Sequence, residues 1–274
     1  MGNQQLERPI GPGELDDVTA VVKAFQRPES LDRLIRSIRR FYPELRIVVV
    51  DDSFEPYQPN GVDYVRLEPD SGTAAGRNAG VERVKTPYFL ILDDDLEFTE
   101  DTRIERLARI ARIQGITLAA GLFLLCRKKK RWWGTRIELS PQEFHGMIER
   151  DGDHLKLIRG YGSREDGYYL CDLATQFFVA RTDEVRGMGG WDADLKTTDH
   201  VEFFVRLKQH GCRVAYCPDV TVRHWRSRPE GYRSFRQRDF TGVWVRKHGI
   251  NLLTEMSGRE RFFGPVQSRG GEQR

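Results

Sequence analysis

A run of apolar residues that ends in three consecutive aspartates limits the folds open to this chain. The residues Tyr-Phe-Leu-Ile-Leu at 88–92 precede Asp93, Asp94 and Asp95. Five apolar residues are too few to span a membrane and are typical of a strand buried on both faces. Adjacent carboxylates repel one another, so the triplet needs a counter-charge, and a hard divalent cation with oxygen ligands would supply it. The alternative interpretation is a solvated acidic turn.

Strand and helix patterns alternate around this acidic strand. The first half of the chain has apolar runs and helical spacings that predict strands at 18–24, 46–50, 64–67 and 88–92 and helices at 29–41, 71–85 and 99–113. A β-α-β order requires right-handed crossovers and a mostly parallel central sheet flanked by helices. Ligands bind beyond the carboxyl ends of such strands, where Asp51, Asp52 and Asp93 are expected to meet. Arg77 adds a positive charge near a helix start, which favours phosphate.

The second half of the chain is less regular. Strands are predicted at 118–125, 175–180, 213–216 and 221–223, with helices at 182–186 and 199–211. We expect residues 126–170 to be an insertion of short strands and loops. The predicted domain is 17–248, with a nucleotide-binding half at 17–117 and an acceptor half at 118–248, between a flexible tail at 1–16 and a C-terminal tail at 249–274.

The composition predicts a soluble, globular α/β protein. Hydrophobic residues make up 39% and charged residues 31% of the sequence. No apolar run is long enough for a membrane span, and residues 1–17 lack the core of a signal peptide, so we expect a cytoplasmic protein without a membrane anchor. The four cysteines lack zinc-site spacing and are expected to be free thiols. The basic run 127–131 is followed by Trp132 and Trp133, which suits an anionic partner or a solvated loop.

Several ordered motifs resemble those of nucleotide-sugar glycosyltransferases. The segments 19–28, 50–53, 76–80 and 92–95 look like the successive signatures of the GT-A fold, in the spacing of the family 2 group. The segments 37–43, 177–183 and 200–204 are similar to the catalytic domain of β-1,4-N-acetylgalactosaminyltransferases. The resemblance covers roughly residues 17 to 230 and is weakest across 126–170. It implies a GT-A, Rossmann-like fold.

The resemblance also implies a binding site for a UDP-sugar and a metal ion. Asp51 or Asp52 would hydrogen-bond the uracil ring, and the loop from Phe25 to Arg27 would cover it. The Arg77 guanidinium would approach the diphosphate. The metal ligands would be Asp93 and Asp95 of a DxD motif together with His224, while Asp94 between them would contact the nucleotide. A histidine ligand favours Mn2+ over Mg2+.

The acceptor hydroxyl needs a general base, for which the resemblance points to the start of the helix at 199–211. Asp199, then His200, then Glu202 are the candidates. Asp199 and Glu202 alternatively form a capping box. Two further side chains have alternative interpretations: Trp191 stacks on a sugar or fills the core, and Arg77 pairs with Asp70 or Glu82. Direct attack would invert the anomeric centre.

The sequence therefore predicts a metal-dependent inverting glycosyltransferase that moves an N-acetylhexosamine or hexose from a UDP-sugar to an acceptor hydroxyl. The acceptor would be a glycan, or a polyanion such as an acidic glycan or hydroxylated nucleic acid. The alternatives are a metal-dependent phosphatase and a catalytically silent sugar- or nucleic-acid-binding module. Two βα units precede the acidic strand, whereas the phosphatase interpretation needs that strand to come first.

Overall fold

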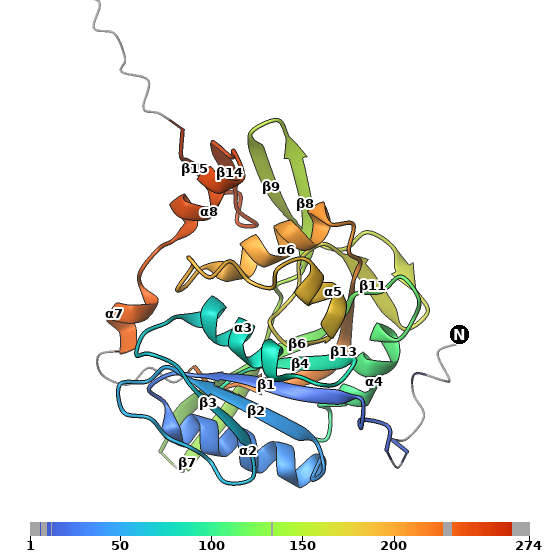
Figure 1. Cartoon of the computed structure of the whole chain (residues 1–274), viewed down its shortest axis with the longest axis vertical. Helices are drawn as coiled ribbons and strands as arrows, with labels where there is room; N and C mark the ends of the chain where they lie inside the picture. Colours follow the sequence, from blue (N-terminus) through green and yellow to red (C-terminus); the bar gives the residue numbers. More distant parts are fainter. Residues whose placement is uncertain (1–5, 7–9, 12, 133, 227–231, 265–274) are drawn as a thin grey trace, which may run out of the picture.

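A long mixed β-sheet forms the centre of the molecule (Figure 1). The computed structural model describes residues 6, 10–11, 13–132, 134–226 and 232–264. The strands of this sheet, in chain order, are β1 (Val18–Ala24), β2 (Arg46–Asp51), β3 (Asp63–Arg66), β4 (Tyr88–Asp93), β5 (Leu96–Glu97), β6 (Leu118–Arg131), β7 (Gly134–Gln142), β10 (Arg164–Glu165), β11 (Tyr168–Cys171), β12 (Phe178–Arg181) and β13 (Val214–His224). Their spatial order is β10-β11-β13-β6-β12-β4-β1-β2-β3, with β5 on β13 and β7 on β6.

The amino-terminal half of the sheet is parallel. β1 pairs in parallel with β2 and β4, and β2 pairs in parallel with β3. β12 runs antiparallel between β4 and β6, after which β6 and β13 are parallel again. The predicted α/β fold with a mostly parallel central sheet is confirmed. Because β1, β2 and β4 all end at one edge, the segments that follow them lie together.

Helices cover both faces of the sheet. The helices in the described residues are α2 (Pro28–Phe41), α3 (Thr73–Arg83), α4 (Ile104–Ala111), α5 (Thr182–Gly187), α6 (Asp199–Gln209), α7 (Tyr232–Arg236) and α8 (Thr241–Lys247). Figure 1 shows α2 below the sheet and α3, α5 and α6 above it. Ala20 and Val22 of β1 share a buried cluster with Leu34 of α2, whereas Val21 shares the opposite cluster with Val81 of α3. Side chains that alternate along each strand therefore fill two cores.

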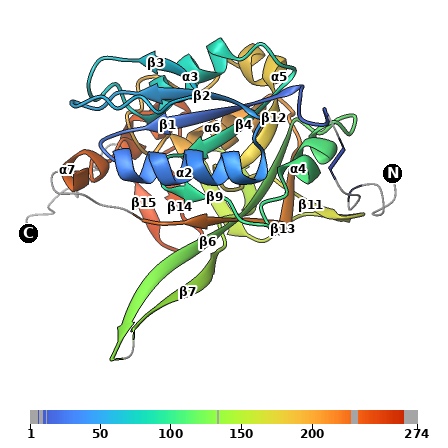
Figure 2. The ribbon, with the colours of Figure 1, turned by 90° about the horizontal axis from the view of Figure 1, so that it is seen from below.

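Residues 126–170 are more regular than predicted. β6 continues through the basic run and pairs with β7, in a register that runs from Phe123↔Gln142 to Arg131↔Gly134. Figure 2 shows this hairpin projecting from the body of the molecule. Nearly all β7 side chains are exposed, so its sequence lacks the alternation with buried apolar residues that identifies a strand. β8 (Gly146–Asp151) and β9 (His154–Arg159) form a second hairpin.

The segment predicted as a C-terminal tail contributes two strands. β14 (Leu252–Thr254) pairs in parallel with β9, and β15 (Glu260–Phe262) pairs antiparallel with β14. These strands complete a small second sheet, ordered β15-β14-β9-β8. Leu253 is buried there among the residues of the main core. Such short strands give too little periodicity to be recognised in the sequence, and residues 265–274 of the predicted tail lie outside the described residues.

The described part of the predicted N-terminal tail also contacts the body. The Arg109 guanidinium of α4 donates to the Glu14 carboxylate at 2.5 and 2.8 Å and to the Leu6 carbonyl oxygen at 2.9 Å. The Leu6 side chain is buried. Residues 1–5, 7–9 and 12 of this segment lie outside the described residues. Specific contacts with α4 therefore replace the flexible attachment that we expected for this segment.

Smaller differences have local causes. α4 begins at Ile104 rather than at residue 99, because the Thr102 hydroxyl accepts a hydrogen bond from the Thr99 amide and holds a turn. The two strands predicted at 213–216 and 221–223 are one strand, β13, with an irregularity between them. The four cysteines are free, as expected. Among the described residues we find no helix with the length and apolarity needed to cross a bilayer.

Candidate functional site

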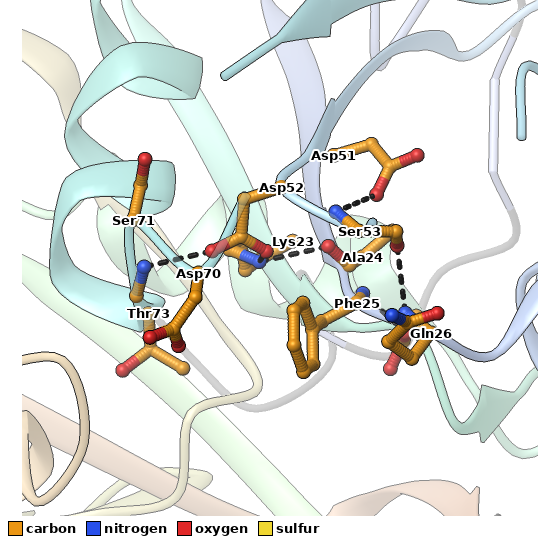
Figure 3. Close-up of polar contacts among 12 residues, drawn as sticks. Lys23, Ala24, Phe25, Gln26, Asp51, Asp52, Ser53, Asp70, Ser71 and Thr73 are labelled. Carbon is orange, nitrogen blue, oxygen red and sulfur yellow. Dashed lines mark hydrogen bonds and ion pairs between the residues drawn. The ribbon is translucent and has the colours of Figure 1, made fainter. Parts of the chain in front are cut away.

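The carboxyl ends of β1, β2 and β4 carry charged side chains in one row. Lys23 of β1 is paired in register with Asp93 of β4, and β2 ends beside them at Asp51. The carboxylate of the next residue, Asp52, accepts hydrogen bonds from Lys23 Nζ and, at 2.7 Å, from the Gly72 amide (Figure 3). The sequence interpretation missed Lys23, although a lysine inside an otherwise apolar strand is a detectable signal.

Asp51 and Asp52 have different surroundings. The Asp51 carboxylate accepts hydrogen bonds from the Ser53 amide at 2.8 Å, the Tyr57 amide at 3.0 Å and the Tyr64 hydroxyl at 2.9 Å. Through these three hydrogen bonds, Asp51 holds the loop after β2 in place. Asp52 lines the pocket at the carboxyl edge, so it is the better placed of the two to contact a ligand.

Two arginines neutralise the acidic triplet. Asp93 Oδ1 accepts from Arg77 at 2.9 Å. Arg27 donates to the Asp94 carboxylate and, at 2.5 Å, to Asp95 Oδ2. The triplet is therefore not a solvated acidic turn, and Asp94 and Asp95 are buried.

Burial and neighbouring charges shift the pKa values of Arg27 and Asp94 in opposite directions. Burial lowers the pKa of the Arg27 guanidinium, but the carboxylates of Asp94 and Asp95 raise it, and the net pKa lies above its ordinary value. Burial raises the pKa of Asp94 from 3.8 to about 6, against the lowering effect of Arg27. A cation is thus required here, and in this state the loop between β1 and α2 supplies it.

Arg77 connects β4 to α6. Its guanidinium donates to Asp199 Oδ2 at 2.6 Å as well as to Asp93, and the Thr73 hydroxyl donates to Asp199 Oδ1 at 2.9 Å. Burial lowers the pKa of Arg77, but the two carboxylates raise it above its ordinary value. Arg77 does not pair with Asp70 or Glu82, so that alternative is wrong. The capping-box alternative is also wrong, because no side chain caps α6.

His224 lies next to the acidic triplet because β5 pairs with the end of β13. Leu96 is in register with His224, which brings His224 Nε2 to 3.5 Å from Asp95 Oδ1. His224 Nδ1 lies 3.1 Å from Gln142 Oε1 at the end of β7. A carbonyl oxygen only accepts, so Nδ1 donates to Gln142, and Nε2 is the ring nitrogen on the side of Asp95 that can ligate a metal ion.

Asp95 and His224 fit a divalent cation. Two donors about 2.1 Å from one ion stand about 3 Å apart, close to the observed separation. Asp93, the third predicted ligand, is bound to Arg77 instead. No group of three or more His, Cys, Asp or Glu in the described residues is arranged to hold an ion. Substrate phosphate oxygens complete the coordination of such cations in many enzymes, so two protein ligands are compatible with the chemistry.

The pocket above Asp52 is nearly closed. Phe25 packs against Tyr232 and Phe235 of α7, with ring centroids 5.9 and 5.3 Å apart. The Arg238 guanidinium donates to both oxygens of Asp70, at 2.7 and 2.5 Å, and so fixes the segment after α7. The remaining cavity is about 30 Å³, the share of one water molecule. A cavity of this size is too small for a nucleotide, and the sequence interpretation gave no role to α7, Asp70 or Arg238.

Two of the candidate bases are engaged away from Asp199. The Glu202 carboxylate accepts from Arg206 at 2.5 and 3.1 Å and lies 3.2 Å from His248 Nε2, so Glu202 is a structural residue between α6 and α8. His200 Nε2 donates to the Ala174 carbonyl oxygen at 2.6 Å. Burial lowers the pKa of His200 to about 4. Asp199 is the candidate that lies beside Arg77 and Asp93.

Trp191 is a core residue rather than a sugar platform. Its ring stacks on Phe203 at 4.3 Å between centroids with planes 7° apart, and it is 1% exposed. The Asn78 side chain bonds its backbone N–H and C=O, both at 2.8 Å. The Arg77 guanidinium lies 5.9 Å from the Trp191 ring centroid. Trp191 therefore packs against the Arg77 guanidinium inside the core. This corrects the prediction that Trp191 contacts the ligand.

Gln176 is a buried amide without hydrogen-bond partners two residues before β12. The first residue of β12, Phe178, pairs with Ile91 of β4. The side chain is 3% exposed, and neither Oε1 nor Nε2 has a hydrogen-bond partner. A buried unsatisfied amide costs about 1–3 kcal/mol and requires an explanation. The sequence interpretation missed Gln176, which immediately precedes the Phe177-Phe178 pair.

Comparison with known proteins gives this geometry a context. The model of the glycosyl transferase family 2 matches residues 19–164. The chain is 34% identical over 240 residues to human beta-1,4 N-acetylgalactosaminyltransferase 1, covering 82% of this chain and 43% of the relative. It is 31% identical over 218 residues to mouse beta-1,4 N-acetylgalactosaminyltransferase 2, covering 76% of this chain and 39% of the relative. The chain thus spans about two fifths of the length of these curated relatives.

Solved structures share the fold. The crystal structure of GalNAc-T7 with UDP, GalNAc and Mn2+ superposes with a TM-score of 0.62 at 18% sequence identity. The match covers 84% of this chain and 47% of that one. At this level of identity the likeness describes the fold alone, and it agrees with the GT-A architecture expected from the motifs.

Proposed function

Since the chain belongs to glycosyl transferase family 2, we propose that it transfers a sugar from a UDP-sugar to an acceptor hydroxyl with inversion, in a metal-dependent reaction. The observation that carries the proposal is Arg77, which joins Asp93 to Asp199 beside the Asp95–His224 pair. A fixed guanidinium thus ties the candidate base to the acidic triplet, whose last residue faces His224. The names of the relatives make UDP-N-acetylgalactosamine the first donor to test.

The donor would bind along the row of strand ends. Asp52 offers the uracil ring an acceptor, and the Phe25 loop with α7 covers the base. Opening of the segment fixed by Arg238 admits the nucleotide, and closure excludes water from the reaction. The amide of Gln176, which offers both a donor and an acceptor, suits sugar hydroxyls or an acetamido group.

Asp95 and His224 are the residues that would hold the metal ion, which supplies Lewis-acid stabilisation of the departing diphosphate. Arg27 donates to Asp95 Oδ2, whereas His224 Nε2 faces Asp95 Oδ1, so Oδ1 is the oxygen that would bind the ion.

Asp199 is the proposed general base. Both of its oxygens have partners in this state, Thr73 and Arg77. As the bond between the anomeric carbon and the diphosphate oxygen breaks, negative charge on the diphosphate draws the Arg77 guanidinium and weakens its hold on Asp199. The carboxylate then takes the proton from the acceptor hydroxyl while the new carbon–oxygen bond forms.

A glycan hydroxyl is the proposed acceptor, supported by the names of the relatives. A polyanionic acceptor stays a prediction that rests on the exposed basic run of β6. If it holds, acceptor affinity falls steeply with salt, and neutralising Lys128, Lys129 and Lys130 weakens it. Unchanged acceptor affinity in that triple variant would exclude the polyanion.

Thermal unfolding with a panel of nucleotide sugars tests the proposal. At a ligand concentration of 100 Kd we expect about 2.7 kcal/mol of protection, or roughly 5–11 °C, from a UDP-sugar with Mn2+ and much less after EDTA. Asp95→Asn should abolish the Mn2+-dependent part, and the exposed acid Glu100→Gln is the matched control. Equal protection of wild type and Asp95→Asn would refute the metal site. Sugar transfer separates the proposal from a silent module, and phosphate release from simple esters would indicate a phosphatase.

A further inference from the structure

The β6–β7 hairpin carries a larger net positive charge than the chain as a whole. Residues 127–142, here called the basic hairpin, contain six Lys or Arg and one Glu, an excess of five, whereas the net charge of the chain is +3. The rest of the chain is therefore net negative, and the positive potential is concentrated on this element. Figure 2 shows that the hairpin extends away from the body. Such a concentration of charge favours an anionic partner.

Apolar side chains are exposed on the same hairpin. Trp132 at the tip is 92% exposed, Ile137 is 43% exposed and Leu139 is 46% exposed. Ile137 lies opposite Lys128 in the register, and Leu139 lies opposite Cys126, so these side chains share one face. Basic and large apolar groups are therefore interleaved toward solvent. Trp133, the second tryptophan of the run, lies outside the described residues.

The basic surface continues from the hairpin onto α2. Lys128 Nζ and the Arg33 guanidinium lie 5.7 and 5.5 Å from the Trp225 ring centroid. Arg36 and Arg40 of α2 are exposed and line the adjoining groove. Four arginines and two glutamates, Glu97 and Glu100, line this groove, so positive charge predominates beyond the hairpin tip as well.

We propose that the basic hairpin and the adjoining face of α2 dock the protein on an anionic lipid bilayer. Trp132 and Ile137 would enter the headgroup region, where indole rings and aliphatic side chains are both favoured, and the lysines and arginines would contact lipid phosphates. A nucleic acid satisfies the charges and stacks on tryptophan, but it offers no counterpart for exposed Ile137 and Leu139. The interleaving of aliphatic and basic side chains therefore favours the bilayer.

The base of the hairpin lies at the carboxyl edge of the sheet. Leu125 of β6, just before the hairpin begins, is in register with His224. Gln142, at the other end of the hairpin, contacts the His224 ring. The hairpin thus begins and ends at the candidate metal site. Binding itself needs no turnover, so it is testable whether or not the proposed donor is correct.

Co-sedimentation of the full chain with vesicles is the test. We expect binding to phosphatidylcholine vesicles that contain phosphatidylserine, little binding to phosphatidylcholine alone, and release at high salt. Lys128→Gln with Lys130→Gln should weaken binding roughly thirtyfold, and Trp132→Ser on the order of tenfold. The Trp132 emission should shift to shorter wavelength on binding, and this shift should be missing in Trp132→Ser.

Matched controls lie elsewhere on the surface. Lys85→Gln with Arg46→Gln removes two exposed basic residues at the opposite edge of the sheet, and Phe262→Ser removes an aromatic ring that is 76% exposed. These variants should bind vesicles like the wild type. Three results would overturn the proposal: no sedimentation with phosphatidylserine vesicles, equal loss in hairpin and control variants, or binding to duplex or single-stranded nucleic acid without binding to vesicles. Unfolding temperatures equal to the wild type show that each variant is folded.

Discussion

Replacing Arg77 by methionine should strongly destabilise the protein. The guanidinium is 4% exposed and is the shared partner of Asp93 and Asp199, at 2.9 and 2.6 Å. Methionine keeps much of the side-chain volume above Trp191 but leaves the buried Asp199 carboxylate with only the Thr73 hydroxyl. Removing one partner of a buried ion pair costs about 3–5 kcal/mol, because the remaining charge is neither solvated nor compensated.

Arg83→Met on the same helix is the matched control. Arg83 pairs with Asp63 at 3.4 Å, with about half of each side chain exposed. Exposed pairs of this kind contribute about 0–1 kcal/mol. Urea unfolding near neutral pH should therefore separate the two variants by at least about 2 kcal/mol, and the unfolding temperature of Arg77→Met should fall by roughly 6–20 °C.

A second substitution tests the cause. Asp199→Asn in the Arg77→Met background removes the unpaired charge, so the double variant should regain about 1–3 kcal/mol. If Arg77→Met lost stability only through poorer packing, Asp199→Asn would not restore it. If Arg77→Met proves as stable as Arg83→Met, or if Asp199→Asn destabilises the double variant further, the explanation by a buried unpaired carboxylate is wrong.

Three further predictions concern single residues. Gln176→Leu should raise the free energy of unfolding by on the order of 1 kcal/mol, because it removes two buried amide atoms without partners; a clear loss in calorimetry would contradict this. Because burial lowers the pKa of His200 from 6.5 to about 4, the unfolded state binds this proton first, and stability falls as the pH drops through 6.5. Between pH 8 and pH 5 the wild type should lose about 2 kcal/mol more than His200→Asn in urea unfolding, and equal losses would refute the assignment. Arg238→Ala should raise the UDP association rate about fivefold in stopped-flow measurements, since it releases the contact with Asp70 that closes the pocket; an unchanged rate would contradict this.

The elements that could be predicted from the sequence are those with a complete local pattern. Continuous apolar runs identified β1, β2 and β4, and the helical spacing of leucines and isoleucines identified α2. The basic hairpin and β14 were missed for the opposite reason. Backbone pairing holds them, between β6 and β7 in the hairpin and with the distant strand β9 for β14, while their side chains are largely exposed or too few to show a period.

The sequence by itself determined that the aspartates after β2 and β4 reach the candidate site. Strands of a parallel sheet end at one edge, so Asp52 and Asp93 must meet there whatever the loops do. Only the tertiary structure decided how the charges are shared: Arg27 binds Asp95, Arg77 binds Asp199, and Glu202 binds Arg206 and lies beside His248. Alternation along a strand is a local property of the backbone, whereas the partner of a buried charge depends on segments brought together from more than 60 residues away, which no local pattern encodes.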